Sequence, residues 1–343
     1  MNTKEVCEQL AVTPKMLRIY EKQELIHAER EANNYRNYAI DDILRIKIIV
    51  TLRSLGFSLK EIKAILDFKK PSNYYLYSFY IQYKAIESKI YKLNNDRMKL
   101  SATINEILQS KENDTKPVNT ILASLNTDNE KTTYEEMINC WNFDNMASDY
   151  VNRYLKKDKG YLNTIRKIQE MILSLPHNKT YLDIGAGTCQ LWTGIPDSYK
   201  LTAIDNSLQM ILKAKKNVPY AIYILEDILL IDTGQFEKFD YVISTFTIHH
   251  IPYEQQKKAL KNIIDLCRKG GRIIIADRSF NNAEDRSAYE KKLIEEGNTE
   301  YLEVINSEFY LIAEDILNYI SGLGFTAECF PLEENIKGFI IDK

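Results

Sequence analysis

The sequence predicts a multidomain protein, in which an all-α helix-turn-helix module with a small β wing and a long dimerisation helix precedes a doubly wound α/β domain. Two short amphipathic helices around a tight turn predict the first module. One unbroken helical pattern over residues 74–109 predicts the long helix. From residue 180, near-continuous apolar strands alternate with helices, which is typical of a mostly parallel sheet covered on both faces.

The composition is that of a globular protein with room for two domains: 343 residues, 45% hydrophobic and 27% charged. Charges begin at Lys4 and no apolar stretch follows, so we expect no signal peptide. No run of about 18 apolar residues occurs, so we expect no membrane span. The cysteines form no C-x-x-C pair, which favours a cytoplasmic location and argues against a zinc or disulfide framework. They are Cys7, Cys140, Cys189, Cys267 and Cys329.

Charge is unevenly distributed along the chain. Residues 1–110 carry 18 Lys and Arg against 13 Asp and Glu, a net charge of +5. Residues 111–343 carry 27 against 35, a net charge of −8. A basic front half suits contact with phosphate, whereas an acidic back half is repelled by it.

The helix-turn-helix module begins with expected helices at residues 4–10 and 14–22. Thr13 is a favourable N-cap for the second helix, and Pro14 suits its first position because the missing N–H costs nothing there. Lys15 and Arg18 are expected on the outer face of this second helix.

A wing and a second helix pair follow. Residues 30–38 combine turn-forming asparagines with alternating aromatic and polar residues, and we interpret them as a small β wing. A helix is expected over 39–55, closed by Gly56. Ser58 and Glu61 then form a capping box that opens another helix.

Three segments of this module, TPKMLRIYEKQEL, NNYRNY and TLRSLGFSLKEIKAIL, resemble the recognition helix, wing and second helix pair of MerR-family regulators. The resemblance covers residues 3–67 and implies a winged helix-turn-helix domain over 1–70 that binds double-stranded promoter DNA. In the MerR family, wing residues contact the phosphate backbone. Such phosphate contacts position the protein, whereas contacts to the bases specify the DNA site. A purely core role for Tyr20 stays open. The implied DNA-binding residues are Thr13, Lys15, Arg18, Tyr20, Tyr35 and Arg36.

Metal-sensing MerR proteins carry cysteines near the start of the dimer helix. No cysteine occurs between Cys7 and Cys140, so a metal effector is not expected and no metal site is predicted.

The helix over 74–109 carries one apolar seam with alternating spacings of three and four residues, typical of a coiled coil. Arg97 interrupts it. The resemblance to MerR proteins implies a homodimer through residues 76–107, and the alternative is a helix that packs on its own domain. The seam consists of Leu76, Phe79, Tyr83, Ile86, Ile90, Leu93, Arg97, Leu100, Ile104 and Ile107.

The second domain is expected over 134–343, after a polar linker at 110–133 that contains Pro117. Its seven candidate strands lie at residues 180–184, 200–205, 220–225, 239–245, 271–277, near 325–330 and at 336–341.

The turn after the first strand of this domain is a candidate ligand site. Gly185 and Gly187 allow close approach of the backbone to a ligand. Asp205 ends the next strand, 22 residues after Asp183, where a carboxylate suits the two hydroxyls of a ribose. Gln190 stands where a dinucleotide-binding turn needs Gly or Ala, which disfavours NAD.

Four segments in order, FDNMASDY, DIGAGTCQ, LEDILLID and STFTIHHI, resemble class I methyltransferases, whose sheet is Rossmann-like. The resemblance implies S-adenosylmethionine as cofactor, with S-adenosylhomocysteine as product and no metal. FDNMASDY is similar to the lid helix of the family. LEDILLID is similar to the segment after the third strand, where the family has an acid near the adenine amine, and STFTIHHI is similar to the segment that faces the sulfonium. The implied cofactor-binding residues are Tyr150, Asp183, Gly185, Ala186, Gly187, Asp205, Asn206, Asp227, Ile228 and Thr245.

One residue departs from the family pattern. Family loops often read GAGTG, and Cys189 replaces the last glycine. A small thiol fits there if its φ is negative. The alternative is a loop that has drifted because catalysis is no longer required.

The activated methyl donor leaves the protein mainly to position an acceptor and exclude water. His249 and His250 are weak candidates for a base, with a capping or packing role as the alternative. The sequence after the fourth strand lacks the Asn/Asp-Pro-Pro-Tyr/Phe of amino-group methyltransferases, and an acidic stretch at 295–308 suits a small-molecule acceptor better than nucleic acid.

Three functional hypotheses follow. The first is a regulator whose C-terminal domain methylates a small molecule, and the second is a regulator whose domain is a non-catalytic ligand sensor. The third is an enzyme whose N-terminal module only dimerises, which the intact Thr13-Pro14, Arg18 and Tyr35-Arg36 set opposes.

Overall fold

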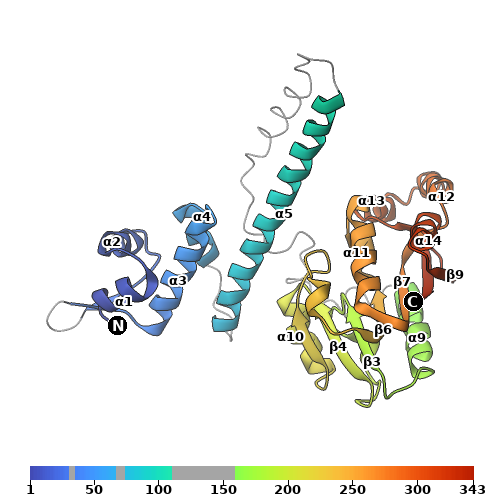
Figure 1. Cartoon of the computed structure of the whole chain (residues 1–343), viewed down its shortest axis with the longest axis horizontal. Helices are drawn as coiled ribbons and strands as arrows, with labels where there is room; N and C mark the ends of the chain where they lie inside the picture. Colours follow the sequence, from blue (N-terminus) through green and yellow to red (C-terminus); the bar gives the residue numbers. More distant parts are fainter. Residues whose placement is uncertain (31–34, 67–73, 110–158) are drawn as a thin grey trace. The chain divides into compact units, whose positions relative to one another are not determined.

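The computed structural model describes residues 1–30, 35–66, 74–109 and 159–343. The chain divides into two compact units, residues 1–140 and 141–343, and each is described by itself (Figure 1). The predicted linker at 110–133, the boundary at 134 and the lid segment with Tyr150 lie outside the described residues.

The described residues of the first unit form helices and a two-stranded wing, as predicted. Thr13 caps α2 by accepting a hydrogen bond from the Met16 amide at 3.2 Å, and Pro14 opens the helix. Buried Asp42 in the first turn of α3 accepts from the amide of the N-cap residue Ala39 and, through its other oxygen, from the amide of His27, at 3.1 Å each. The elements are α1 (Thr3–Leu10), α2 (Pro14–Lys22), β1 (Glu29–Arg30), β2 (Arg36–Asn37), α3 (Ile40–Ser54), α4 (Leu59–Leu66) and α5 (Tyr74–Gln109).

Helix α5 buries one side and exposes the other. Tyr80, Ile81 and Ala85 are buried, and α5 contacts α3. The seam residues whose side chains are described lie on the other side, where the exposed apolar ones range from Leu76 at 37% to Phe79 at 60%. The exposed apolar seam residues are Leu76, Phe79, Ile86, Ile90, Leu93, Leu100 and Ile104.

The second unit is built on one twisted sheet in the order β5-β4-β3-β6-β7-β10-β9, with short β8 added beside β7. The pairs β3/β4, β4/β5, β3/β6 and β6/β7 are parallel, whereas β10 runs antiparallel to both its neighbours. The predicted seven-stranded, mostly parallel sheet is therefore confirmed. The strands are β3 (Thr180–Ile184), β4 (Lys200–Asp205), β5 (Ile222–Leu225), β6 (Phe239–Thr245), β7 (Cys267–Phe280), β8 (Leu311–Ile312), β9 (Thr326–Glu333) and β10 (Ile336–Asp342).

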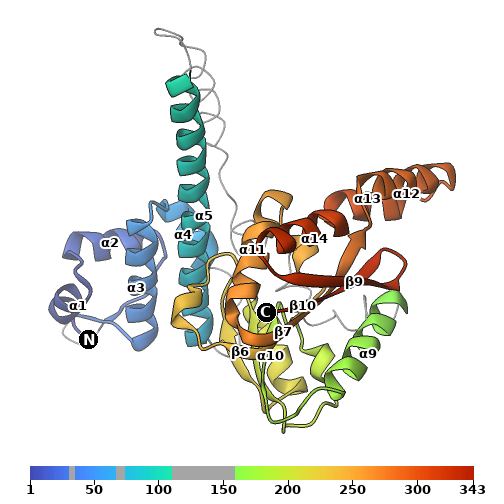
Figure 2. The same ribbon diagram turned by 45° about the vertical axis from the view of Figure 1, so that its right-hand side comes forward.

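Helices cover both faces of this sheet. On one face, apolar residues of α9, η2 and α10 form a core with Tyr181, Leu201 and Ile243 of the strands. Figure 2 shows α11 on the other side of the sheet from α9. The helices are α9 (Lys159–Leu173), η2 (Gln190–Trp192), α10 (Leu208–Asn217), η3 (Thr233–Gln235), η4 (Ile248–His250), α11 (Tyr253–Leu266), α12 (Ala283–Glu295), α13 (Thr299–Ser307) and α14 (Ala313–Gly322).

The sequence prediction missed α9 and β8, and it placed the ends of β7 inside the observed strand. Within the described residues, no helix is long and apolar enough to cross a membrane. The four cysteines of the described residues are free thiols.

Candidate functional site

The loop after β3 is tied to the end of β4 by backbone and carboxylate contacts. The Gly187 amide donates to Asp205 Oδ2 at 2.8 Å, and the Ser207 amide donates to Asp205 Oδ1 at 2.8 Å. The amides of Gly185 and Ala186 donate to the Ile204 carbonyl at 2.9 and 3.1 Å. The predicted loop residues and Asp205 are therefore in direct contact.

The two glycines of the loop serve different purposes. Gly185 has φ +68°, and a Cβ atom there would lie 2.2 Å from Thr247 Oγ1, so the glycine is required by packing within the chain. Gly187 has φ +53°, and no atom lies within 4 Å of its ideal Cβ position. Only Gly187 leaves open space over the loop, so it is the position where a ligand has room to approach.

Cys189 does not meet the condition of a negative φ under which a thiol would fit without strain. Its φ is +55°, in the left-handed region, where a residue with a Cβ costs about 1–2 kcal/mol more than glycine. The side chain is fully buried in the core that includes Trp192, and burial raises the pKa of the thiol. The thiol therefore fills space in the core in spite of the strained backbone.

Asp183 lies inside the domain rather than at its surface. The residue is 1% exposed, its Oδ2 accepts from Trp192 Nε1 at 2.9 Å, and its Oδ1 has no hydrogen-bond partner. Burial raises the pKa of Asp183 to about 7, which the Trp192 hydrogen bond opposes and the Asp205 charge reinforces. Asp183 thus holds the loop through Trp192.

Asp227, after β5, completes a row of three carboxylates at the ends of adjacent parallel strands. The Leu229 amide donates to Asp227 Oδ1 at 2.7 Å, and Asn206 Nδ2 lies 3.5 Å from Asp227 Oδ2. Ile228 beside it is 8% exposed. Because β3, β4 and β5 are parallel neighbours, their carboxyl ends meet at one edge of the sheet, where ligands bind in open α/β sheets.

The segment after β6 packs on the glycine loop through Thr247. Its hydroxyl lies 3.2 Å from the Ile184 carbonyl, 3.3 Å from that of Gly185 and 3.0 Å from that of Thr245. The sequence predicted Thr245, whose contribution to these contacts is a carbonyl group. The contact residue Thr247 was missed, because its role depends on the pairing of β6 with β3.

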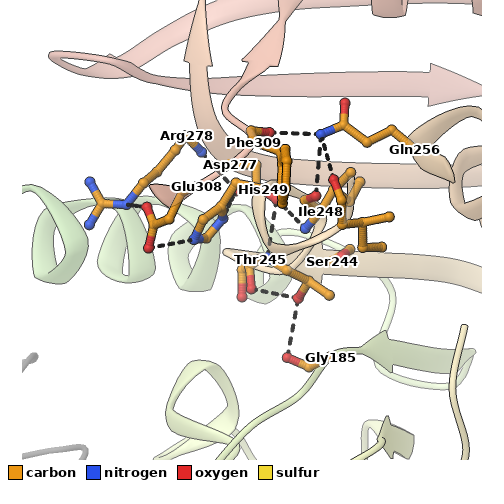
Figure 3. A network of polar contacts seen from close by, with 12 residues as sticks. Gly185, Ser244, Thr245, Ile248, His249, Gln256, Asp277, Arg278, Glu308 and Phe309 are labelled. Carbon is orange, nitrogen blue, oxygen red and sulfur yellow. Dashed lines mark hydrogen bonds and ion pairs between the residues drawn. The ribbon is translucent and has the colours of Figure 1, made fainter. Parts of the chain in front are cut away.

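His249 is held between two carboxylates that the sequence did not predict (Figure 3). Its Nδ1 lies 2.5 Å from Asp277 Oδ1, and its Nε2 lies 3.9 Å from Glu308 Oε1. Asp277 is fully buried, and its Oδ2 accepts from the amides of Thr247 and Ile248 at 3.1 and 2.7 Å. Asp277 therefore fixes both the turn η4 and the orientation of the imidazole ring.

The chain segment around Glu308 is fixed against η4 from a distant part of the sequence. The Phe309 amide donates to the His249 carbonyl at 2.8 Å, and Gln256 Nε2 donates to the carbonyls of Ile251 and Phe309 at 3.1 and 2.7 Å. Arg278 Nε lies 3.9 Å from Glu308 Oε2 (Figure 3).

His250 lies beside His249, with ring centroids 3.9 Å apart. Burial, together with the nearby His249 and Arg278, lowers the pKa of His250 well below its usual value. The ring is therefore neutral near pH 7.

The candidate DNA-contact residues of the first unit divide by exposure. Lys15 and Arg18 are exposed on α2, and Tyr35 of the wing is 72% exposed. Tyr20 is 3% exposed, so its ring belongs to the core of the module. These exposures agree with a surface role for the two cations and with the core alternative for Tyr20.

Arg36 is paired within the protein. Its Nε lies 2.9 Å from Glu21 Oε1, and one terminal nitrogen lies 2.9 Å from Glu21 Oε2. The bidentate pair joins β2 of the wing to α2, a connection that the sequence did not predict.

Comparison with protein families finds one match within each of the two units. Residues 1–69 match the model of the MerR HTH family regulatory proteins, and residues 182–271 match a methyltransferase domain model.

Individual relatives match one half or the other. An uncharacterized methyltransferase of Alkaliphilus oremlandii is 24% identical over 196 residues, 56% of this chain and 89% of that protein. The HTH-type transcriptional regulator HmrR of Rhizobium leguminosarum bv. viciae is 38% identical over 66 residues, 19% of this chain and 51% of that protein. Among solved structures, a DhpI-SAM-HEP complex aligns with a TM-score of 0.45 at 13% identity, covering 60% of this chain and 96% of that one.

Proposed function

We propose that this chain, which joins an N-terminal MerR helix-turn-helix domain to a C-terminal methyltransferase domain, is a homodimeric DNA-binding regulator whose C-terminal domain binds S-adenosylmethionine and methylates a small molecule. The observation that carries the cofactor assignment is the pair of carboxylates, Asp205 and Asp227, at the ends of β4 and β5 beside the open backbone of Gly187.

The residues at this edge fit the proposed cofactor. Asp205 is the acceptor for the ribose hydroxyls, and Asp227 with Ile228 faces the adenine. Gly187 admits the ligand to the backbone. S-adenosylmethionine supplies an activated methyl group on a sulfonium when bound, so the chain's own residues orient the acceptor and exclude water.

Calorimetry should detect binding of S-adenosylmethionine or S-adenosylhomocysteine in the micromolar range, about −8 kcal/mol. Asp205→Ala should weaken it by about 1–3 kcal/mol, because the ribose hydroxyls lose a charged acceptor. The matched control is Asp197→Ala, which removes an exposed carboxylate of the same unit and should leave affinity unchanged. Absence of binding by the wild-type protein would exclude both the enzyme and the cofactor-sensor assignments.

For acceptors that must lose a proton, His249 is the stronger of the two histidine candidates. Asp277 accepts from Nδ1–H, which leaves the Nε2 lone pair on the side of Glu308. His250 has a depressed pKa and is the weaker proton acceptor.

A second candidate function is a ligand sensor without turnover, and the left-handed backbone of Cys189 favours it. Cys189 stands where the family often has a glycine, although its backbone has a left-handed φ of +55°, which favours glycine. Incubation with S-adenosylmethionine and pooled small acceptors separates the two functions: formation of S-adenosylhomocysteine supports the enzyme, and binding without product supports the sensor.

Arg36→Ala should weaken binding to all DNA sequences about equally and reduce the slope of log K against log salt by about one unit, because one phosphate contact is lost. The matched variant is Glu21→Ala, which breaks the same ion pair but keeps the cation. If both variants lose affinity equally with an unchanged salt slope, Arg36 serves only to hold the wing, and the phosphate assignment is wrong.

The homodimer is proposed through residues 76–107 of α5. The support is that this face of α5 exposes a row of apolar side chains, while Tyr80, Ile81 and Ala85 on the other side are buried. Covering this apolar surface with a second copy of the chain would stabilise the dimer by about 25 cal/mol for each Å² of apolar surface buried.

A further inference from the structure

We propose that His249, His250 and Glu308 form a binding site for a divalent transition-metal ion of the zinc type, with Asp277 as the residue that orients His249. One ligand atom from each of the three residues lies within 4.8 Å of the other two. The site shares none of its three ligand residues with the proposed cofactor site.

The orientation of His249 is that of a metal-bound histidine. Ligating histidines usually donate their second ring N–H to a carboxylate, which fixes the tautomer and directs the other nitrogen at the metal. Asp277 Oδ1 occupies this position, 2.5 Å from Nδ1, and the two backbone amides bound to its other oxygen hold the carboxylate in place. The Nε2 lone pair is thereby directed toward Glu308.

The separation between His249 and Glu308 is too long for a hydrogen bond and suits a shared ion. Nε2 lies 3.9 Å from Glu308 Oε1. Two ligands with bonds of ~2.1 Å at a tetrahedral angle lie ~3.4 Å apart, so closure needs a shift of roughly half an ångström. Glu308 follows the last residue of α13, and its side chain alone can supply such a shift.

The charges of the cluster favour binding of a cation, because negative groups outnumber positive ones. Glu308 has a side chain that is 17% exposed, and its Oε2 has no hydrogen-bond partner. Asp277 and Glu308 carry two negative charges against the one positive charge of Arg278, which faces Oε2 and leaves Oε1 toward the histidine.

The donor set selects the class of ion. Two imidazoles and one carboxylate suit zinc and its neighbours, whereas magnesium and calcium prefer oxygen donors throughout. Three protein ligands leave a fourth position open, as in catalytic zinc sites. Because a metal takes the Nε2 lone pair, His249 is either a metal ligand or a proton acceptor.

The test is calorimetric titration of zinc ions into the full-length protein after treatment with a chelator. One ion per chain is expected. Glu308→Gln and His250→Ala should each weaken binding at least a hundredfold, and Asp277→Asn, which keeps all three ligands, should weaken it roughly 10–100-fold. X-ray absorption should show nitrogen and oxygen ligands without sulfur, which excludes binding by cysteines.

The matched control is the double variant His27→Gln and His177→Gln, which removes the two exposed histidines and should bind zinc like the wild type. Loss of binding in this control, unchanged binding in Glu308→Gln, or no binding of one ion per chain would each overturn the metal site. S-adenosylmethionine affinity measured in the same metal-free samples reports separately on the proposed cofactor site.

Discussion

Gly185→Ala is expected to destabilise the C-terminal unit by about 2–5 kcal/mol, because a left-handed alanine costs about 1–2 kcal/mol and overpacking costs about 1–3 kcal/mol. The new Cβ would lie 2.2 Å from Thr247 Oγ1 and 2.3 Å from its Cγ2. Gly187→Ala is the matched control, since it has the same left-handed backbone without a steric contact and should cost only about 1–2 kcal/mol.

Urea unfolding followed by the fluorescence of buried Trp192 measures this difference. The second tryptophan, Trp141, is first replaced by phenylalanine so that the signal reports on one site. Adding Thr247→Ala to Gly185→Ala should recover part of the loss, because two of the three closest atoms leave. Equal unfolding midpoints for the Gly185 and Gly187 variants would show that Thr247 does not constrain the loop.

Ile90→Asp is expected to convert the dimer to a monomer and to reduce operator affinity by about a hundredfold or more, because an unpaired charge would be buried at the interface and the two half-site contacts would be uncoupled. Ile90 is 40% exposed in the single chain, at the middle of the seam. Leu93→Asp should act in the same way. Sedimentation and DNA-binding anisotropy measure the two effects.

Ala102→Asp is the control for this pair. It introduces the same carboxylate at an exposed position of the same helix, on the side away from the seam. It should remain dimeric and bind DNA like the wild type. A wild-type protein that sediments as a monomer at micromolar concentration would mean that the seam has another role.

The ends of the strands could be predicted where an apolar run stops at a glycine or a carboxylate. The strands β3, β4 and β6 begin and end at the predicted residues; for the first two, Ile184 precedes a glycine and Asp205 is a carboxylate. The short strand β8 carries only two residues, Leu311 and Ile312, which is too little for a sequence pattern to register.

The candidate site was predictable only in its local parts. The Gly185–Gly187 loop and Asp205 are recognised by spacing along the chain. Glu308 reaches His249 across 59 positions, and Asp277 does so across 28, so their contact depends on how β7 pairs with β6 and where the chain returns after α13. The sequence left the φ of Cys189 open, because its left-handed value is set by the turn into η2 and not by the residue itself.

Asp183 couples folding of the C-terminal unit to the uptake of a proton. Its pKa rises from an ordinary value of 3.8 to about 7 in the folded chain, so between these values the folded state holds a proton that the unfolded state has released. The contribution of this carboxyl therefore falls as the pH rises from about 4 to about 7, and above that range the fold must carry a buried charge. The C-terminal unit is consequently expected to be more stable in slightly acidic than in alkaline solution. The same proton determines whether Asp183 in β3 carries a negative charge, and this charge interacts with that of Asp205.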